Sequence, residues 1–259
     1  MIRLKSPHDI EKLREGGKIL AFVHDAIEAR ISSGVTGIEL DELAREEISK
    51  QGCKPAFLNY APHGHEPYPA ALCVSVNSAV VHGLPSVEPF RDGDVVGLDL
   101  GLIYQRKYYL DSARTLIVGE GSEVAKELTR VTKESLRRGI AAAQVGQRTG
   151  DIGYAIQNYV ENYEAESTRE GFWVVRQLVG HGVGFAVHEE PQVPNFGRPG
   201  TGTVLKPGLV IAIEPMVTAG DATVTTGADG WSVVVRSGNL SAHFEHTIAV
   251  TDKGPQILT

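Results

Sequence analysis

Two aspartates of this chain lie in apolar stretches, where an ionised carboxylate is unfavourable. Asp99 stands in the run 95–100 and Asp111 in the run 108–111, and both runs are typical of buried strands. The polar residues 105–107 between the runs indicate a turn, so we expect one β-hairpin. A buried carboxylate needs a charged partner or a cation. The hairpin therefore predicts a positive group between its two acids.

Further acids and histidines with apolar or glycine-rich neighbours occur elsewhere in the chain. They are His82, His181, His188, Glu214 and Glu245. Together with the two aspartates, this set offers four carboxylates and a neutral imidazole, which suits two divalent transition ions a few Å apart. Oxygen-rich ligation with one nitrogen favours Co, Mn, Fe or Zn over a metal selected by thiolates. The set therefore predicts a metal centre.

Each of these residues also has an ordinary structural interpretation. A single acid in a strand is more often an edge residue than a ligand, and a histidine beside glycines is more often a hydrogen-bonded structural group. Only the combination of four embedded acids requires neutralisation, for which a metal is the simplest physical answer. Other polar residues are interpreted as solvent-exposed, namely His8 and His24 on the first helix, the loop residues His63 and His65, and the pair Glu189 and Glu190.

The composition is that of a soluble globular protein with 259 residues, of which 42% are hydrophobic and 22% charged. The net charge of −7 argues against a nucleic-acid-binding or anionic-membrane surface. No run approaches the roughly 18 apolar residues of a membrane-spanning helix, and the charged N-terminus lacks the apolar core of a signal peptide. Two cysteines, Cys53 and Cys73, indicate no disulfide framework. We therefore predict a cytoplasmic protein.

Hydrophobic spacing predicts two helices followed by strands, and then the same order again. Helices are expected from Ser6, from Thr36, over about 122–145 and after Thr149, and strands over 72–77, 80–83, 95–100, 108–111, 209–214, 231–235 and 242–250. Residues 90–99 also match residues 205–214, with Gly93 aligned to Gly208 and Asp99 to Glu214. We therefore predict an α+β fold built by duplication, as a single domain over 1–259 with internal halves at about 1–120 and 121–259.

Short motifs spread over the chain resemble those of the type I methionine aminopeptidases, which have the pita-bread fold. They are residues 81–85 (VHGLP), 92–99 (DGDVVGLD), 110–112 (LDS), 180–184 (GHGVG), 188–191 (HEEP), 213–216 (IEPM) and 244–247 (FEHT). Each motif alone is weak, but the combination is highly specific and covers nearly the whole chain. The resemblance implies pseudo-two-fold αα–β halves and a central antiparallel sheet covered by helices. No large helical insertion separates His188 from Glu214, which fits type I better than type II.

The resemblance also implies a dinuclear metal centre with five protein ligands. Asp111 and Glu245 would bridge the two metals, and Asp99 would chelate one of them. His181 and Glu214 would complete the coordination of the other. A water acidified by the two cations would be the nucleophile, and Glu214 would accept its proton.

Further roles follow from the same resemblance. His188 resembles the residue that stabilises the carbonyl oxygen of the substrate, and His82 the residue that contacts the scissile amide nitrogen. Val187 is usually aromatic in this family and Phe57 usually small, so the two changes are expected to compensate in volume. The loop between residues 60 and 73 is longer than the family pattern. The implied methionine pocket consists of Phe57, Tyr60, Cys73, Val187 and Trp231, and an auxiliary monovalent cation would be held by Asn77 and Ser241.

The implied activity is removal of the initiator methionine from nascent proteins when the second residue is small. The substrates would be nascent N-termini near the ribosome, and the protein would be a monomer without direct contact to nucleic acid or membrane. One alternative is a proline-directed peptidase of the same fold, a prolidase or aminopeptidase P, which generally carries a separate N-terminal domain. None fits before Ser6. Another alternative is a non-enzymatic binding protein, which would be expected to lack metal ligands.

Overall fold

The computed structural model describes residues 2–62 and 66–259. Its helices are α1 (Pro7–Arg30), α2 (Gly37–Lys50), α3 (Glu123–Ala142) and α4 (Thr149–Glu161). The strands are β1 (Lys54–Pro55), β2 (Leu72–Val76), β3 (Ala79–Val81), β4 (Val95–Tyr104), β5 (Tyr108–Ile117), β6 (Phe172–Val174), β7 (Val179–Gly182), β8 (Glu189–Pro194), β9 (Val210–Ile213), β10 (Met216–Ala219), β11 (Val224–Thr226), β12 (Val233–Val235), β13 (Ser241–His243), β14 (Glu245–Thr251) and β15 (Gly254–Ile257). Within the described ranges, no helix has both the length and the apolar character needed to cross a membrane.

The two N-terminal helices begin where their capping residues predict. The Ser6 hydroxyl accepts the backbone N–H of Asp9, whose carboxylate accepts the N–H of Ser6 in return. Thr36 and Glu39 form the same reciprocal pair at the start of α2. Helix α1 continues without interruption past Gly16. The missing side chain at Gly16 lets the helix lie close to the sheet, since a Cβ there would collide with side chains of Tyr104 and Leu110.

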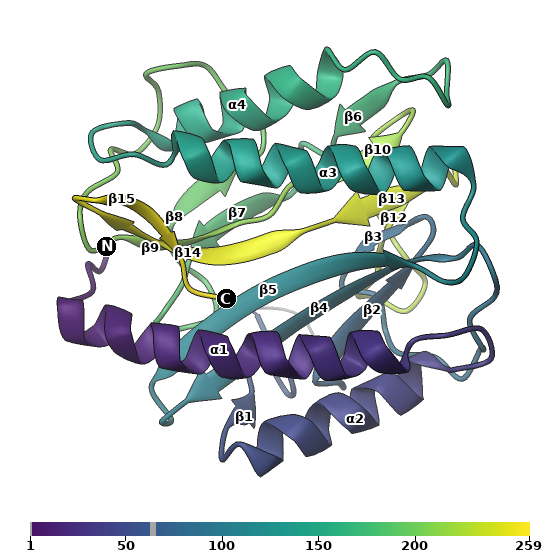
Figure 1. Cartoon of the computed structure of the whole chain (residues 1–259), viewed down its shortest axis with the longest axis horizontal. Helices are drawn as coiled ribbons and strands as arrows, with labels where there is room; N and C mark the ends of the chain where they lie inside the picture. Colours follow the sequence, from purple (N-terminus) through teal and green to yellow (C-terminus); the bar gives the residue numbers. More distant parts are fainter. Residues whose placement is uncertain (1, 63–65) are drawn as a thin grey trace.

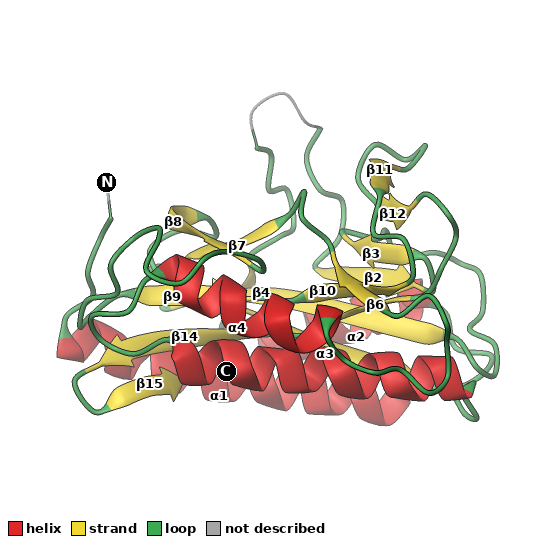
Figure 2. Cartoon of the chain, turned by 90° about the horizontal axis from the view of Figure 1, so that it is seen from above, coloured by secondary structure: helices red, strands yellow, loops and turns green. Residues whose placement is uncertain are grey.

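A nine-stranded antiparallel sheet forms the centre of the fold, with the order β1-β4-β5-β14-β9-β7-β8 and with β2 beside β4 and β15 beside β14. Helices α1 and α2 lie against one half of the sheet and α3 and α4 against the other (Figure 1). The view from above shows the helices on one side, while β7, β8 and the β11–β12 hairpin lie toward the other (Figure 2). Consequently the helix-free side is where loops can build a site.

The predicted hairpin is present, and its two strands place the aspartates near each other. Strands β4 and β5 pair so that Gly101 lies opposite Asp111 and Asp99 opposite Ala113. The turn contains Gln105 and Arg106 with φ values of 50° and 58°. Two consecutive residues in the left-handed region match the twist of a tight antiparallel hairpin.

The matched segments of the two halves share a turn geometry. Gly93 has φ 90° and Gly208 has φ 89°. The N–H of Gly93 donates to Val118 at the end of β5, and the N–H of Gly208 donates to Val250 near the end of β14. Each glycine therefore lies two residues before a strand, β4 or β9, whose pairing with β5 or β14 brings two of the acids together. This shared geometry supports the predicted duplication, while the half boundaries stay a prediction.

Two predictions about local structure are wrong. His24 is not on the surface of α1, since it is only 1% exposed and its Nε2 lies 3.0 Å from the Ser112 carbonyl oxygen. The expected strand 242–250 is divided at Phe244. Its first part, β13, pairs with β10 in a small sheet, and its second part, β14, pairs with β5 and β9 in the central sheet. The strand is interrupted at Phe244 because its two parts pair with strands of different sheets.

Candidate metal centre and substrate pocket

Five strands of the central sheet bring the predicted metal ligands to one place. Asp99 comes from β4, Asp111 from β5 and His181 from β7. Glu214 directly follows β9, and Glu245 is the first residue of β14. These strands are neighbours in the order β4-β5-β14-β9-β7. The sheet order therefore assembles residues that are up to 146 positions apart (245 − 99).

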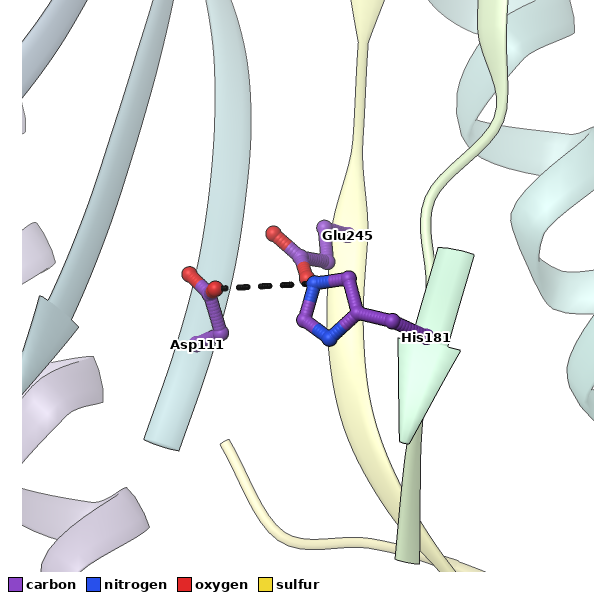
Figure 3. Close-up of side chains that lie close together, drawn as sticks. All are labelled: Asp111, His181 and Glu245. Carbon is purple, nitrogen blue, oxygen red and sulfur yellow. Dashed lines mark ion pairs between the residues drawn. The ribbon is translucent and has the colours of Figure 1, made fainter. Parts of the chain in front are cut away.

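The ligand atoms converge closely enough to share a metal ion. One ligand atom each from Asp111, His181 and Glu245 lies within 4.8 Å of the other two, and Figure 3 shows these side chains pointing toward one another. Nε2 of His181 is 3.9 Å from Oδ2 of Asp111 and 3.4 Å from Oε1 of Glu214. The backbone around Asp111 is fixed as well, because its N–H and carbonyl both bond to the Thr247 hydroxyl.

The acids are buried and repel one another. Burial, and then the charge of Asp99, raises the pKa of Asp111 well above its usual range. Burial, followed by the charge of Asp111, does the same to the pKa of Glu245. Burial raises the pKa of Glu214 to about 8 and that of Asp99 to about 6. Without a cation, this part of the sheet therefore disfavours ionised carboxylates.

The donor set fits divalent transition ions. Buried oxygens of Asp99, Asp111 and Glu245 have no hydrogen-bond partner among the described residues. His181 Nδ1 lies 2.9 Å from the Gly182 carbonyl oxygen, which can only accept, so Nδ1 carries the proton. In the neutral ring, Nε2 then has a free lone pair directed at the carboxylates, and burial keeps the ring neutral by lowering its pKa to about 3.

A cavity of about 560 Å³ opens beside this cluster. Its walls include the predicted pocket residues Phe57, Tyr60, Cys73 and Trp231, together with His82, His188 and the five predicted ligands. Val187 is not in the cavity wall but belongs to the same buried apolar cluster as Phe57 and Cys73. The structure thus brings together every residue that was predicted to bind the substrate side chain.

The two predicted catalytic histidines lie at the same cavity. The His188 ring packs edge-on against His181 with 4.4 Å between ring centroids, and its Nδ1 is 2.6 Å from the Tyr60 hydroxyl. Desolvation lowers the pKa of His188. His82 follows β3 with φ 58°, a left-handed conformation that turns the chain sharply at the cavity wall.

Glu189, the neighbour of His188, is not solvated as predicted. Its Oε2 accepts the Lys5 ammonium at 2.7 Å, and the two side chains are almost completely buried. Its Oε1 accepts the N–H groups of Phe185 and Ala186. Glu189 therefore ties the N-terminal segment to the loop that carries His188. Its neighbour Glu190 is exposed, in agreement with the prediction.

Asn77 and Ser241 also meet, although a cation between them stays a prediction. The backbone N–H of Ser241 donates to the Asn77 carbonyl oxygen at 2.9 Å. The Ser241 hydroxyl lies 2.9 Å from the carbonyl oxygens of both Asn77 and Ala79. The Ser241 hydroxyl has one proton and can donate it to only one of these two carbonyl oxygens at a time. The other carbonyl oxygen then lies close to the hydroxyl without receiving its proton.

Two cavity or cluster residues were missed by the motif analysis. Tyr68 lines the cavity and donates its hydroxyl to the Gly83 carbonyl at 2.8 Å. Its signal was an aromatic residue shortly before a predicted strand. His243 lies 3.6 Å from Glu214. Its spacing of two residues from Glu245 would indicate one face of a continuous strand, but the strand is divided at Phe244, so the sequence pattern does not explain this contact. The predictions for His63 and His65 lie outside the described residues.

Comparisons with known proteins agree with this geometry. The family model of metallopeptidase family M24 matches residues 11–252. The methionine aminopeptidase of Clostridium perfringens is 46% identical over 259 residues, which cover 100% of this chain and 99% of that protein. The crystal structure of a methionine aminopeptidase from Thermotoga maritima has a TM-score of 0.91 at 45% identity, covering 100% of this chain and 99% of that one.

A more distant neighbour is the prolidase of Pyrococcus horikoshii, with a TM-score of 0.76 and 25% identity. The match covers 99% of this chain but 63% of the prolidase. Both kinds of neighbour share the fold, and the methionine-specific proteins match over their whole length. The chain is therefore more similar to the methionine aminopeptidases than to the prolidase.

Proposed function

Because the chain belongs to metallopeptidase family M24, we infer that it is a hydrolase that removes methionine from the N-terminus of peptides and proteins. The observation that carries this inference is the buried acid cluster with one imidazole lone pair, lying beside an apolar cavity. The cluster can hold cations, and the cavity can hold an unbranched apolar side chain next to them.

Two divalent ions, of Co, Mn, Fe or Zn, are the proposed cofactors. Asp99, Asp111, His181, Glu214 and Glu245 would hold them. When bound, such ions act as Lewis acids that make hydroxide available near neutral pH. A monovalent cation near Asn77 and Ser241 is a further part of the proposal. Metal analysis of the purified protein measures how many ions it binds and which ones. Activity after reconstitution with each ion shows which of them supports the reaction.

The chain's own residues would handle the substrate and its protons. Glu214 accepts the proton of the attacking water, because it lies at the cavity wall beside the cluster. His188 would donate a hydrogen bond to the carbonyl oxygen, which gains negative charge as the carbonyl carbon becomes tetrahedral. His82 contacts the nitrogen of the scissile amide. Phe57, Tyr60 and Trp231 enclose the methionine side chain.

Hydrolysis of short peptides by the metal-reconstituted protein tests this function. We expect release of methionine from Met-Gly-X and Met-Ala-X, slower release when the second residue is large, and no cleavage of X-Pro peptides. Cleavage of X-Pro peptides instead would favour the prolidase activity named for some structural neighbours. An absence of turnover with all four metals would contradict both enzymatic functions.

The cellular setting is a separate part of the proposal. The substrates would be nascent polypeptides near the ribosome in the cytoplasm, and the protein would act as a monomer without binding nucleic acid or membrane directly. Size-exclusion chromatography with light scattering tests the oligomeric state. Fractionation of cell extracts, with and without nuclease treatment of polysomes, tests the location and any dependence on intact RNA.

A further inference from the structure

A second buried imidazole, His243, lies at the metal cluster without a role in the proposed reaction. It is 2% exposed, and its Nε2 has no hydrogen-bond partner among the described residues. The same atom lies 3.6 Å from Oε2 of Glu214, slightly beyond hydrogen-bond distance. A buried ring nitrogen without a hydrogen-bond partner destabilises the fold. The position of this nitrogen beside a carboxylate therefore suggests that the two groups interact.

The backbone holds His243 firmly in this position. The Thr115 hydroxyl donates to the His243 carbonyl oxygen at 2.6 Å and accepts the His243 N–H at 2.9 Å. On the other side, strand pairing places His243 opposite Met216, which lines the cavity. The chain then changes sheets at Phe244. Strands β5 and β10 therefore fix the backbone of His243, and its buried ring lies beside Glu214.

Glu214 lies between two imidazoles that face different oxygens. Nε2 of His181 is 3.4 Å from Oε1, and Nε2 of His243 is 3.6 Å from Oε2. The His181 proton is already on Nδ1, where it binds the Gly182 carbonyl, so Nε2 of His181 offers a lone pair. When a bound metal keeps Glu214 ionised, its carboxylate can only accept hydrogen bonds. In that state His181 offers a lone pair to the metal, while His243 can offer an N–H to Glu214.

We propose that His243 is a positioning residue that donates its Nε2–H to Oε2 of Glu214 and thereby directs Oε1 toward His181 and the metal. This inference rests on the proposed metal-dependent function. The 3.6 Å separation is a few tenths of an ångström longer than a hydrogen bond, so the proposal requires the two groups to move closer when a metal binds. Outer hydrogen bonds of this kind orient ligating carboxylates and strengthen metal binding.

Direct ligation of a metal by His243 is the competing role. The group of ligand atoms that lie within 4.8 Å of one another consists of Asp111, His181 and Glu245, and among the described residues it does not extend to His243. A metal held by that group would therefore find its nitrogen ligand in His181. Asp99 and Glu214 also lie outside that group, so membership of it does not by itself separate the two roles. Support of Glu214 is favoured by the approach of His243 Nε2 to Glu214 Oε2 at 3.6 Å.

Nitrogen NMR on the unmodified protein separates the two roles. In histidine-labelled protein loaded with diamagnetic Zn²⁺, we expect His243 Nε2 to show a directly attached proton and His181 Nε2 to show the shift of a metal-bound nitrogen. A metal-bound or unprotonated Nε2 at His243 would overturn the proposal. Each histidine nitrogen signal is assigned by its disappearance from the spectrum of the variant that lacks that histidine.

Calorimetric titration of Mn²⁺ into chelator-treated protein gives a second readout. We expect His243→Leu to weaken binding by about tenfold or more, the range for lost outer partners. His243→Gln, which can still offer an N–H, should stay within about threefold of the unmodified protein. His24→Leu is the matched control, since it also removes a buried imidazole with an unpaired nitrogen but faces no metal ligand, and it should bind Mn²⁺ normally.

Each outcome decides the question. Unchanged Mn²⁺ affinity in a folded His243→Leu variant, as checked by thermal unfolding, would contradict the positioning role. Equal loss in His243→Gln and His243→Leu would also contradict it and favour ligation. If His243→Leu does not fold, the NMR result on the unmodified protein decides alone. Metal binding without methionine release would refute the proposed function while leaving the role of His243 intact.

Discussion

The hydroxyl oxygen of Tyr60 lies 2.6 Å from Nδ1 of His188 and joins the loop before β2 to the residue that precedes β8. Desolvation lowers the pKa of His188, so the ring is neutral near pH 7 and has one proton. If the Tyr60 hydroxyl donates to Nδ1, that proton must be on Nε2. The contact therefore prepares His188 to donate a hydrogen bond from Nε2 into the cavity.

Replacing Tyr60 by phenylalanine should weaken catalysis without removing metal. We expect Tyr60→Phe to lower kcat/KM for Met-Ala-Ser by about fivefold to tenfold, because one neutral hydrogen bond contributes ~1 kcal/mol. Steady-state kinetics at saturating Mn²⁺ measures this. Tyr68→Phe is the control, since Tyr68 lines the same cavity but bonds to the Gly83 carbonyl instead of His188. Equal effects of the two variants would argue against a special role for Tyr60.

The second prediction concerns the volume of the methionine pocket. Phe57 and Val187 belong to one buried cluster, and the Phe57 ring lies against Gly101, where an added Cβ would stand 2.7 Å from the ring. Val187→Phe adds four carbons behind the cavity wall and should push the Phe57 ring into the pocket, because Gly101 leaves that ring little room on its other side. We expect KM for Met-Ala-Ser to rise by about tenfold or more, since a hydrophobic pocket discriminates strongly even at the level of one methylene. The kinetics of the variant with several N-terminal residues measures the change in selectivity.

A double variant separates crowding from general damage. Phe57→Ala combined with Val187→Phe should recover most of the lost affinity, because it returns volume to the pocket. If Val187→Phe alone leaves KM unchanged, or if the double variant is worse than both single variants, the compensation between these two positions is wrong. Thermal unfolding of all three variants checks that the fold survives the substitutions.

Much of the fold was predictable because its signals are local. The Asp99–Asp111 hairpin follows from two apolar runs and a polar turn, although the left-handed backbone of Gln105 and Arg106 was not predicted. The caps at Ser6 and Thr36 act within three residues of the chain. Such features depend on neighbours in sequence, so their patterns can be read directly.

Other features depend on residues far away in the chain. His24 looked exposed on an isolated helix, but α1 lies on β5 and buries it against the Ser112 carbonyl. The break at Phe244 arises because β13 and β14 find partners in different sheets. The approach of His243 to Glu214 depends on that break. The motifs indicated the five proposed ligands, which the sheet brings to one place, whereas they did not indicate the imidazole of His243 beside them.

The third prediction concerns acid stability away from the cavity. The Glu127 carboxylate accepts hydrogen bonds from the hydroxyl and N–H of Ser167, the N–H of Glu166 and the hydroxyl of Tyr163. Burial alone would raise the pKa of Glu127, but these bonds outweigh it and lower the pKa to about 2. An unfolded glutamate has a pKa of about 4.3. Glu127 therefore stabilises the fold above about pH 4.3 and loses this contribution as the pH falls toward 2.

Denaturant unfolding across pH measures this contribution. Glu127→Gln should reduce the free energy of unfolding by about 2 kcal/mol at pH 7, the range for hydrogen bonds to a charged group, and the difference from the unmodified protein should shrink below about pH 4. Glu123→Gln is the control, because Glu123 lies in the same helix with an 81% exposed side chain. A difference that stays constant from pH 7 to pH 3 would mean that the hydrogen bonds do not favour the ionised form.

The last prediction uses the repulsion among the buried acids. In chelator-treated protein, Asp111 shares a buried region with other carboxylates, and burial together with the charge of Asp99 raises its pKa. Asp111→Asn removes one of these acids, while the Thr247 hydroxyl keeps both backbone contacts. The metal-free variant should therefore be at least as stable as the metal-free unmodified protein, although it should be inactive.

Thermal unfolding with and without Mn²⁺ provides the measurement. At an ion concentration 100-fold above Kd, the unmodified protein gains about 2.7 kcal/mol, which corresponds to a Tm increase of roughly 5–10 °C for a chain of this size. Asp111→Asn should lose most of that increase, while Asp25→Asn, which changes an exposed acid paired with Arg114, should keep it. A clear drop in metal-free stability of Asp111→Asn would mean that Asp111 stabilises the fold by itself, and a normal Mn²⁺ response would mean that it is not a metal ligand.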